Sequence, residues 1–294
     1  MPKASANGIE VEYDTTGDPT DPALLLIMGL SAQMTAWDDE FVALLAGHGF
    51  FVIRFDNRDI GLSTFFDDAG APDLAAGLTD GVIPPPAYTL VDMAADAAGL
   101  LDALGLERAH IVGASMGGMI AQTFAIRYPA RTISLVSIMS TTGNPAVGSP
   151  HPHVAEALFF ASAPTNRDEA MDAGVASAKL IGSTGFPFEE DRIRTMAAQA
   201  YDRSFHPEGV ARQLLAIVTQ ADRTTDLAGL SVPTLVIHGE ADVLVDPSGG
   251  RATADAIPGA QLWTVPGMGH DNPRPLFTEL ADRIAGHCSA ASVA

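Results

Sequence analysis

The chain of 294 residues is 47% hydrophobic and 18% charged, a composition that excludes a wholly disordered protein. In α/β proteins this length is typical of one main domain with an insertion. The 16 basic and 36 acidic residues give a formal net charge of −20, so like-charge repulsion disfavours nucleic acids and anionic membrane surfaces as partners.

The single cysteine, Cys288, excludes an internal disulfide bond and lies away from any spacing typical of metal ligands. The first residues, MPKASANGIEVEY, lack the apolar core of a signal peptide, and the apolar stretch ALLLIMGL is too short to cross a bilayer. These features predict a soluble, cytoplasmic protein without a membrane partner. The sequence leaves the oligomeric state open, a homodimer included.

Strand signals run along most of the chain. Asn7-Gly8 predicts a two-residue hairpin turn, followed by the alternating segment IEVEYDTTG. Apolar runs then predict strands at residues 24–28, 50–55, 110–114, 133–139, 234–239 and 261–265. Runs that are apolar throughout fit strands buried on both faces of a mainly parallel sheet.

Helical patterns lie between these runs. The segment 88–105 begins with a Thr89-Asp92 pair that resembles a capping box, and Gly105 can end the helix. Its apolar residues share one helical face: Leu90, Met93, Ala97, Leu100, Leu101 and Leu104. Further helices are predicted at 116–129 and 274–287. Alternating strands and helices predict an α/β, doubly wound architecture.

The alternation of strands and helices stops between about Thr141 and Leu230. No strand-like run occurs there, and short amphipathic segments lie among prolines and glycines. We interpret residues 141–230 as a helical cap, or lid, inserted into a core domain of residues 1–140 and 231–294. The alternative is a long surface excursion without functional meaning.

The segment GASMG, residues 113–117, matches the pattern G-x-S-x-G between a predicted strand and a predicted helix. Such a turn presents the Ser115 hydroxyl above the sheet edge, and the backbone N–H of Met116 points into the same space. Glycine-rich turns between a strand and a helix also bind phosphate, so the pattern alone leaves that alternative open.

A serine hydroxyl needs a base, and the base needs an orienting acid. His270 lies in a glycine-rich loop after the last predicted strand, and Asp242 follows the strand at 234–239. Glu240 and Asp246 are alternative acids, but Asp242 occupies the loop position of a G-x-x-D pattern. The segment HPH at 151–153 lacks an obvious third ligand, so no metal is predicted.

A second backbone donor for an oxyanion is expected from the loop MGLSAQ after the first buried strand, which places the amide of Leu30 opposite that of Met116. The polar loop DNRDIGLS carries Asp56, Arg58 and Asp59. We interpret it as a salt-bridged structural corner rather than as catalytic machinery.

Together these residues resemble the α/β-hydrolase fold superfamily, in the branch of serine esterases with a helical cap. The matching segments are MGLSAQMTAW, FDNRDIGLST, GASMGG, VPTLVIHGEAD and PGMGH, and the order Ser115, Asp242, His270 is that of the superfamily. The Met-Gly loop and RFDNRDIGLST resemble the aclacinomycin methylesterase group, whose members cleave a carbomethoxy ester from a polyketide. Many relatives carry His-Gly where this chain has Met28-Gly29.

The resemblance implies a serine-dependent hydrolase of a small-molecule carboxylic ester, hydrophobic and of the polyketide or methyl ester type, that needs no cofactor or metal. Rival hypotheses with the same three residues are carbon-carbon bond hydrolysis, lactone opening and cofactor-free perhydrolysis, and a different class is a non-catalytic binding protein. Large apolar residues are predicted to line the substrate pocket, with ordinary core packing as the alternative. They are Met28, Trp37, Phe159, Phe160, Phe186 and Phe188.

Overall fold

The computed structural model describes residues 1–72, 83–159 and 163–293. They form one eight-stranded sheet with the order β1-β2-β4-β3-β5-β6-β7-β8, in which β1, β2 and β4 pair antiparallel and all other neighbours pair parallel. The strands are β1 (Lys3–Ala6), β2 (Ile9–Thr16), β3 (Ala23–Ile27), β4 (Phe51–Phe55), β5 (Ala109–Ala114), β6 (Thr132–Ile138), β7 (Thr234–Gly239) and β8 (Gln261–Val265).

The predicted α/β architecture is confirmed. Each apolar run is a strand within one residue of its expected bounds, and β3, β5 and β7 are buried along their whole length. The hairpin turn between β1 and β2 is Asn7-Gly8, with φ of 50° and 80°. Positive φ at both positions is what a tight turn between twisted antiparallel strands requires.

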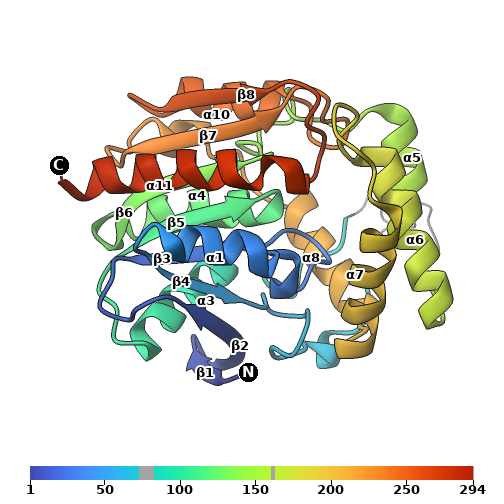
Figure 1. Cartoon of the computed structure of the whole chain (residues 1–294). Helices are drawn as coiled ribbons and strands as arrows, with labels where there is room; N and C mark the ends of the chain where they lie inside the picture. The colour runs from blue at the N-terminus through green and yellow to red at the C-terminus, as the bar shows by residue number, and fades with distance from the viewer. Residues whose placement is uncertain (73–82, 160–162, 294) are drawn as a thin grey trace.

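Helices cover both faces of the sheet (Figure 1). Those outside the β6–β7 connection are α1 (Asp39–Gly47), α3 (Leu90–Ala103), α4 (Met116–Arg127), α10 (Ser248–Ala256) and α11 (Phe277–Val293), with short 3-10 turns at Met34–Ala36, Asp67–Ala69, Pro129–Arg131 and Arg274–Leu276. Two apolar clusters result. Leu25 and Ile27 of β3 pack under α3 and α4, whereas Leu24 and Leu26 point to the opposite face and pack under α1 and α11.

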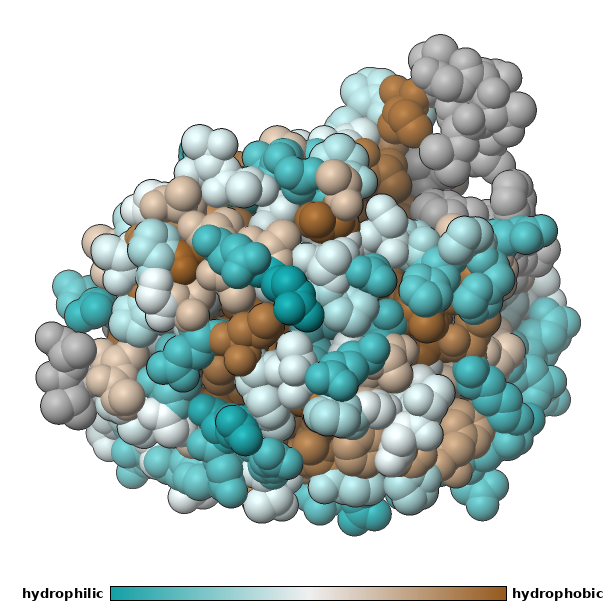
Figure 2. All heavy atoms as spheres, turned by 90° about the horizontal axis from the view of Figure 1, so that it is seen from above, coloured by the Kyte–Doolittle hydropathy of each residue, from teal (hydrophilic) through white to brown (hydrophobic). Residues whose placement is uncertain are grey.

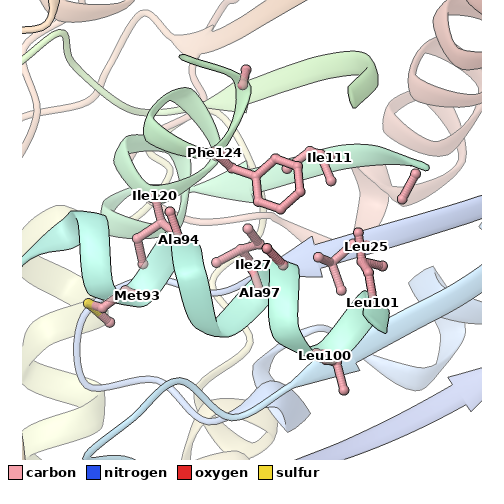
Figure 3. Packing of buried hydrophobic residues seen from close by; sticks show 14 of the residues in the cluster. Leu25, Ile27, Met93, Ala94, Ala97, Leu100, Leu101, Ile111, Ile120 and Phe124 are labelled. Carbon is pink, nitrogen blue, oxygen red and sulfur yellow. The ribbon is translucent and has the colours of Figure 1, made fainter. Parts of the chain in front are cut away.

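Helix α3 has the predicted capping box, because the Thr89 amide donates to the Asp92 carboxylate and the Asp92 amide donates back to the Thr89 hydroxyl. Its apolar stripe faces the sheet (Figure 3), where Met93, Ala97 and Leu101 are buried against residues of β3, β5 and α4. The stripe is the reason the segment folds as a helix here, since each turn adds apolar surface to the core.

Between β6 and β7 the described residues contain helices and no strand, as predicted. The helices are α5 (Pro152–Phe159), α6 (Arg167–Ile181), α7 (Glu190–Arg203), α8 (Pro207–Val218) and α9 (Thr224–Leu227). Helices α5, α6 and α7 stand at one side of the sheet (Figure 1). We call residues 141–230 the insertion. Helices α6 and α7 were not given individual bounds from the sequence, and each buries a single residue, Val175 in α6 and Ala198 in α7.

Hydrophilic residues spread over the face seen from above, with hydrophobic ones in several separate groups between them (Figure 2). No helix in the parts of the chain described here is both long enough and apolar enough to cross a membrane.

The DNRDIGLS loop after β4 joins the core to the insertion through buried ion pairs. Arg212 of α8 makes two contacts of 2.8 Å with the Asp59 carboxylate, and Arg203 of α7 lies 2.7 Å from Asp56. Arg58 pairs with Asp96 of α3 at 2.6 Å. The interpretation of this loop as a salt-bridged structural corner is confirmed.

We expect Arg212→Met to lower the free energy of unfolding by about 3 kcal/mol, because it leaves the Asp59 carboxylate buried without its partner. Burial raises the pKa of Asp59, but hydrogen bonds from Arg212, the Phe66 amide and Tyr88, together with the charge of Arg212, outweigh burial and hold the pKa below its ordinary value. Arg167→Met is the matched control, since the Arg167–Asp202 pair is exposed, and it should cause no measurable change. Urea unfolding followed by circular dichroism compares the two, and equal stability would contradict the expectation.

Candidate active site

Ser115 occupies a strained turn between β5 and α4, with φ 57° and ψ −122°. Positive φ is costly for a residue with a side chain, so the surrounding packing has to impose it. A Cβ atom at Gly113 would overlap the carbonyl of Gly117, and one at Gly117 would overlap the carbonyl of Ile27. The glycines are therefore required by the close approach of strand, turn and helix.

The three residues expected to act together are brought into one hydrogen-bonded chain. His270 Nε2 lies 2.8 Å from Ser115 Oγ, and His270 Nδ1 lies 2.8 Å from Asp242 Oδ2. With its proton on Nδ1, the imidazole donates to Asp242 and accepts from the Ser115 hydroxyl at Nε2. Asp242 follows β7 and His270 follows β8, so neighbouring parallel strands carry both loops to the same edge of the sheet as Ser115.

The alternative acids do not contact His270. Glu240 accepts a hydrogen bond from Thr264 at an exposed position, and Asp246 accepts one from the Ser248 amide at the start of α10. Asp242 is the carboxylate that reaches the imidazole, and its other oxygen accepts from two backbone amides in its own loop.

Asp242 is ionised at neutral pH. Burial raises its pKa, but hydrogen bonds from His238 and His270, the charge of His270 and the Val245 amide outweigh burial and lower the pKa to about 2. His238 lies inside β7, fully buried, with Nε2 2.8 Å from the Val245 carbonyl and 3.4 Å from Asp242 Oδ2. The carboxylate thus carries its negative charge beside both imidazoles.

The two expected oxyanion donors belong to segments next to Ser115. Met116 is the first residue of α4, where helix N–H groups have no partner within the helix. A Cβ at Gly29 would lie 3.0 Å from Ser115 Cβ, which places the loop carrying Leu30 against the serine. Neither the Leu30 nor the Met116 amide donates to another atom in the described parts of the chain.

The loop after β3 is held by the insertion, a contact that the sequence did not reveal. Gln213 of α8 accepts from the Ser31 amide at 3.2 Å and donates to the Arg58 carbonyl at 2.8 Å. Gln33 donates to the carbonyls of Ala200 and Ser204 at the end of α7. Single polar residues such as Gln213 and Gln33 give no periodic signal in the sequence. Only their position in the folded chain shows that they hold the loop after β3.

Of the residues predicted to line the pocket, Met28 and Trp37 are buried in the core. Trp37 is 1% exposed and stacks on Phe41 in the core, where Met28 also packs, so for both the alternative of ordinary core packing fits. Phe186 is half-buried against the edge of that cluster, and Phe188 is 43% exposed with the Lys179 ammonium over its ring. Phe160 and the side chain of Phe159 lie outside the described residues.

No group of three or more His, Cys, Asp or Glu residues that could hold a metal ion occurs in the described segments. His151 and His153 lie with ring centroids 6.0 Å apart, and His151 faces Asp246 at 3.8 Å.

Comparison with known proteins gives consistent matches. Residues 22–273 match the family described as alpha/beta hydrolase fold. Rhodomycin D methylesterase DauP of Streptomyces sp. (strain C5) is 32% identical over 297 aligned residues, and rhodomycin D methylesterase DnrP of Streptomyces peucetius is 30% identical; each alignment covers 94% of both chains. Among solved structures, the enol-lactonase from Burkholderia xenovorans LB400 has a TM-score of 0.73 at 26% identity and covers 100% of both chains.

The predicted resemblance to a methylesterase group is confirmed by the two Streptomyces relatives, and with it the prediction of an esterase-type enzyme. The family match extends over most of the chain and includes β3 to β8, Ser115, Asp242 and His270. The chain belongs to the alpha/beta hydrolase fold family.

Proposed function

We propose that this chain is a serine-dependent carboxylic-ester hydrolase that acts through an acyl-enzyme. The observation that carries the proposal is the hydrogen-bonded chain from Ser115 through His270 to Asp242, with both contacts at 2.8 Å. Nucleophile, base and orienting acid are in reach of one another, which is the arrangement that activates a serine hydroxyl.

In the proposed mechanism His270 Nε2 takes the proton of Ser115 as Oγ attacks the ester carbonyl. The ionised Asp242 stabilises the imidazolium, and the amides of Leu30 and Met116 donate to the oxyanion. One such donor is worth roughly 10² to 10³ in rate. His270 then protonates the leaving alcohol, and afterwards it activates a water molecule that hydrolyses the acyl-enzyme. The strained φ of Ser115 supports this assignment, because such strain is concentrated at functional sites.

We further propose that the insertion, residues 141–230, acts as a cap over a core of residues 1–140 and 231–294, and that the substrate is a hydrophobic methyl ester. The rhodomycin D methylesterases support this substrate class, because they align over 94% of this chain. Contacts of α7 and α8 with the loops after β3 and β4 support the proposed cap, because the loop after β3 also lies against Ser115.

Opening of a lactone is the second candidate, and the likeness to an enol-lactonase at 26% identity favours it. A lactone is a cyclic ester, so attack by Ser115 and stabilisation of the oxyanion are the same. The difference lies in the leaving alcohol, which stays attached to the acyl group.

The experiment is a substrate panel with the purified protein: p-nitrophenyl acetate and butyrate, a carbomethoxy polyketide, an enol-lactone and a vinylogous ring-fission diketone. We expect hydrolysis of the nitrophenyl esters and release of methanol from the carbomethoxy compound, because the active-site chemistry requires only an accessible ester carbonyl. Consumption of the lactone or the diketone with no turnover of any open-chain ester would contradict the proposal. Nitrophenolate absorbance and methanol release are the measurements.

A further inference from the structure

The turn between α6 and α7 is hydrogen-bonded directly to the loop that carries His270. The His270 amide donates to the Ile181 carbonyl at 2.7 Å, and the Gly185 amide donates to the Gly267 carbonyl at 2.9 Å. Between these two contacts lies Ser183. We call residues 181–185 the latch turn. Part of the insertion is therefore bonded to the backbone of the proposed base itself.

Ser183 contacts the residues on both sides of His270. Its hydroxyl accepts from the Gly269 amide at 2.9 Å and donates to Asp271 Oδ1 at 2.5 Å, while its own amide donates to the same carboxylate oxygen at 2.9 Å. One side chain of the insertion thus binds the backbone amide of the residue before the histidine and the side-chain carboxylate of the residue after it. Together with the bond to Ile181, three consecutive residues of the loop are held.

Glycines allow the two segments to touch. A Cβ at Gly269 would overlap the backbone of Gly182, and a Cβ at Gly185 would lie 2.7 Å from Gly267 Cα, closer than real Cβ atoms approach. The latch turn and the His270 loop are thus packed backbone against backbone. Such contact leaves little room for the loop to shift while the latch turn stays in place.

Asp271 is a half-buried carboxylate that the proposed reaction does not use. Burial raises its pKa above the ordinary value, although the Ser183 hydroxyl and amide act in the opposite direction. A partly buried acid is costly unless it is hydrogen-bonded, and Ser183 supplies hydrogen bonds to Asp271 among the described residues. These bonds give Asp271 a role in ordering the loop that carries His270.

We propose that Ser183 and Asp271 are positioning residues that act as one unit to hold His270 at the distance required for proton transfer from Ser115. The inference rests on the proposed function, since it assigns a role relative to the proposed base. With this role for Ser183, the insertion is part of the active site in addition to its proposed function as a cap.

The test uses Ser183→Ala, Asp271→Ala, the double variant and Asp271→Asn, with Thr184→Ala as the matched control because Thr184 is an exposed neighbour in the same turn. Turnover of p-nitrophenyl butyrate gives kcat and KM, and the rate of covalent labelling of Ser115 by a fluorophosphonate gives a second readout. Each alanine variant should lose about 10-fold in kcat and in labelling rate, with KM within about twofold, because small displacements of a catalytic group are costly.

The double variant should lose no more than either single variant, because each single change already breaks the unit. Asp271→Asn keeps an oxygen that can accept from Ser183, so it should retain kcat within about threefold. Thr184→Ala should match the wild type.

Multiplicative losses of about 100-fold in the double variant, losses confined to KM, or wild-type values in both alanine variants would overturn the inference. Failure of the proposed function looks different, because then the wild type itself would show neither ester turnover nor labelling of Ser115. Asp271→Asn and thermal melts of every variant separate a change in positioning from a failure to fold.

Discussion

Ser115→Ala is expected to lower kcat/KM for p-nitrophenyl butyrate by at least about 10⁴-fold, because removal of the hydroxyl removes the only group proposed to form the acyl-enzyme. Any activity that remains in this variant would come from the oxyanion donors and from substrate binding alone. The fold should persist, since the turn is held by contacts of Gly113, Gly117 and the backbone, none of which involves Oγ. Steady-state rates and a burst of nitrophenolate in the wild type are the measurements.

Ser137→Ala is the matched control, because Ser137 is a buried serine at the centre of the same sheet whose hydroxyl accepts from Gln122 and has no contact with His270. It should retain most of the activity. Equal activity of Ser115→Ala and the wild type would remove Ser115 from the mechanism. A burst that survives in the alanine variant would do the same.

Asp242→Asn is expected to lower kcat by about 10⁴-fold while the protein stays folded. An asparagine amide cannot stabilise the imidazolium, and its NH₂ group facing Nδ1 would favour the tautomer with the proton on Nε2. In that tautomer Nε2 cannot accept from Ser115. Asp246→Asn is the matched control, four residues along the same loop and without contact to His270, and it should keep nearly full activity. The reverse ranking of the two variants would move the acid to Asp246.

Asp242→Asn should also change how the free energy of unfolding depends on pH. The folded-state pKa of Asp242 is about 2, below the value of about 3.9 for an unfolded aspartate. A lowered pKa contributes stability above the unfolded value, and that contribution is lost as the pH falls through the folded value. Asp242→Asn should therefore be less stable than the wild type by about 2 kcal/mol near neutral pH, and the difference should shrink as the pH approaches about 2. Urea unfolding of both proteins across this range is the measurement.

Much of the fold could be predicted because its signals are local. Strands buried on both faces are mostly apolar, so the runs that became β3 to β7 could be found without knowing their neighbours. Strand β8 was also found from its apolar residues, although its first two residues are exposed. Helix α3 shows its period and its cap within its own residues. Residues 141–230 were predicted to be helical, but helices α6 and α7 were not given individual bounds, and each buries a single residue in the structure.

The prediction of pocket residues shows that the type of a side chain does not by itself distinguish a substrate pocket from the protein core. Trp37 is large and apolar, and those properties suit a substrate pocket and a protein core equally well. Its place under α1, stacked on Phe41, follows from how the chain packs rather than from any pattern around position 37. The contacts of Gln213 with Ser31 and of Ser183 with Asp271 could not be predicted for the same reason, since each joins segments that lie far apart in the chain.

The sequence by itself determined which segments form the parallel strands, the turn at Ser115 between glycines, and the two loops that carry Asp242 and His270. Each of these features depends on the chemistry of residues that are neighbours in the chain. Only the tertiary structure decided that Asp242, and not Glu240 or Asp246, contacts the imidazole. It also decided that Ser183 binds Asp271 across 88 positions and that Arg212 binds Asp59 across 153. Hydrogen bonds and ion pairs act over a few ångströms, so their partners are selected by the folded arrangement of loops, which no local pattern encodes.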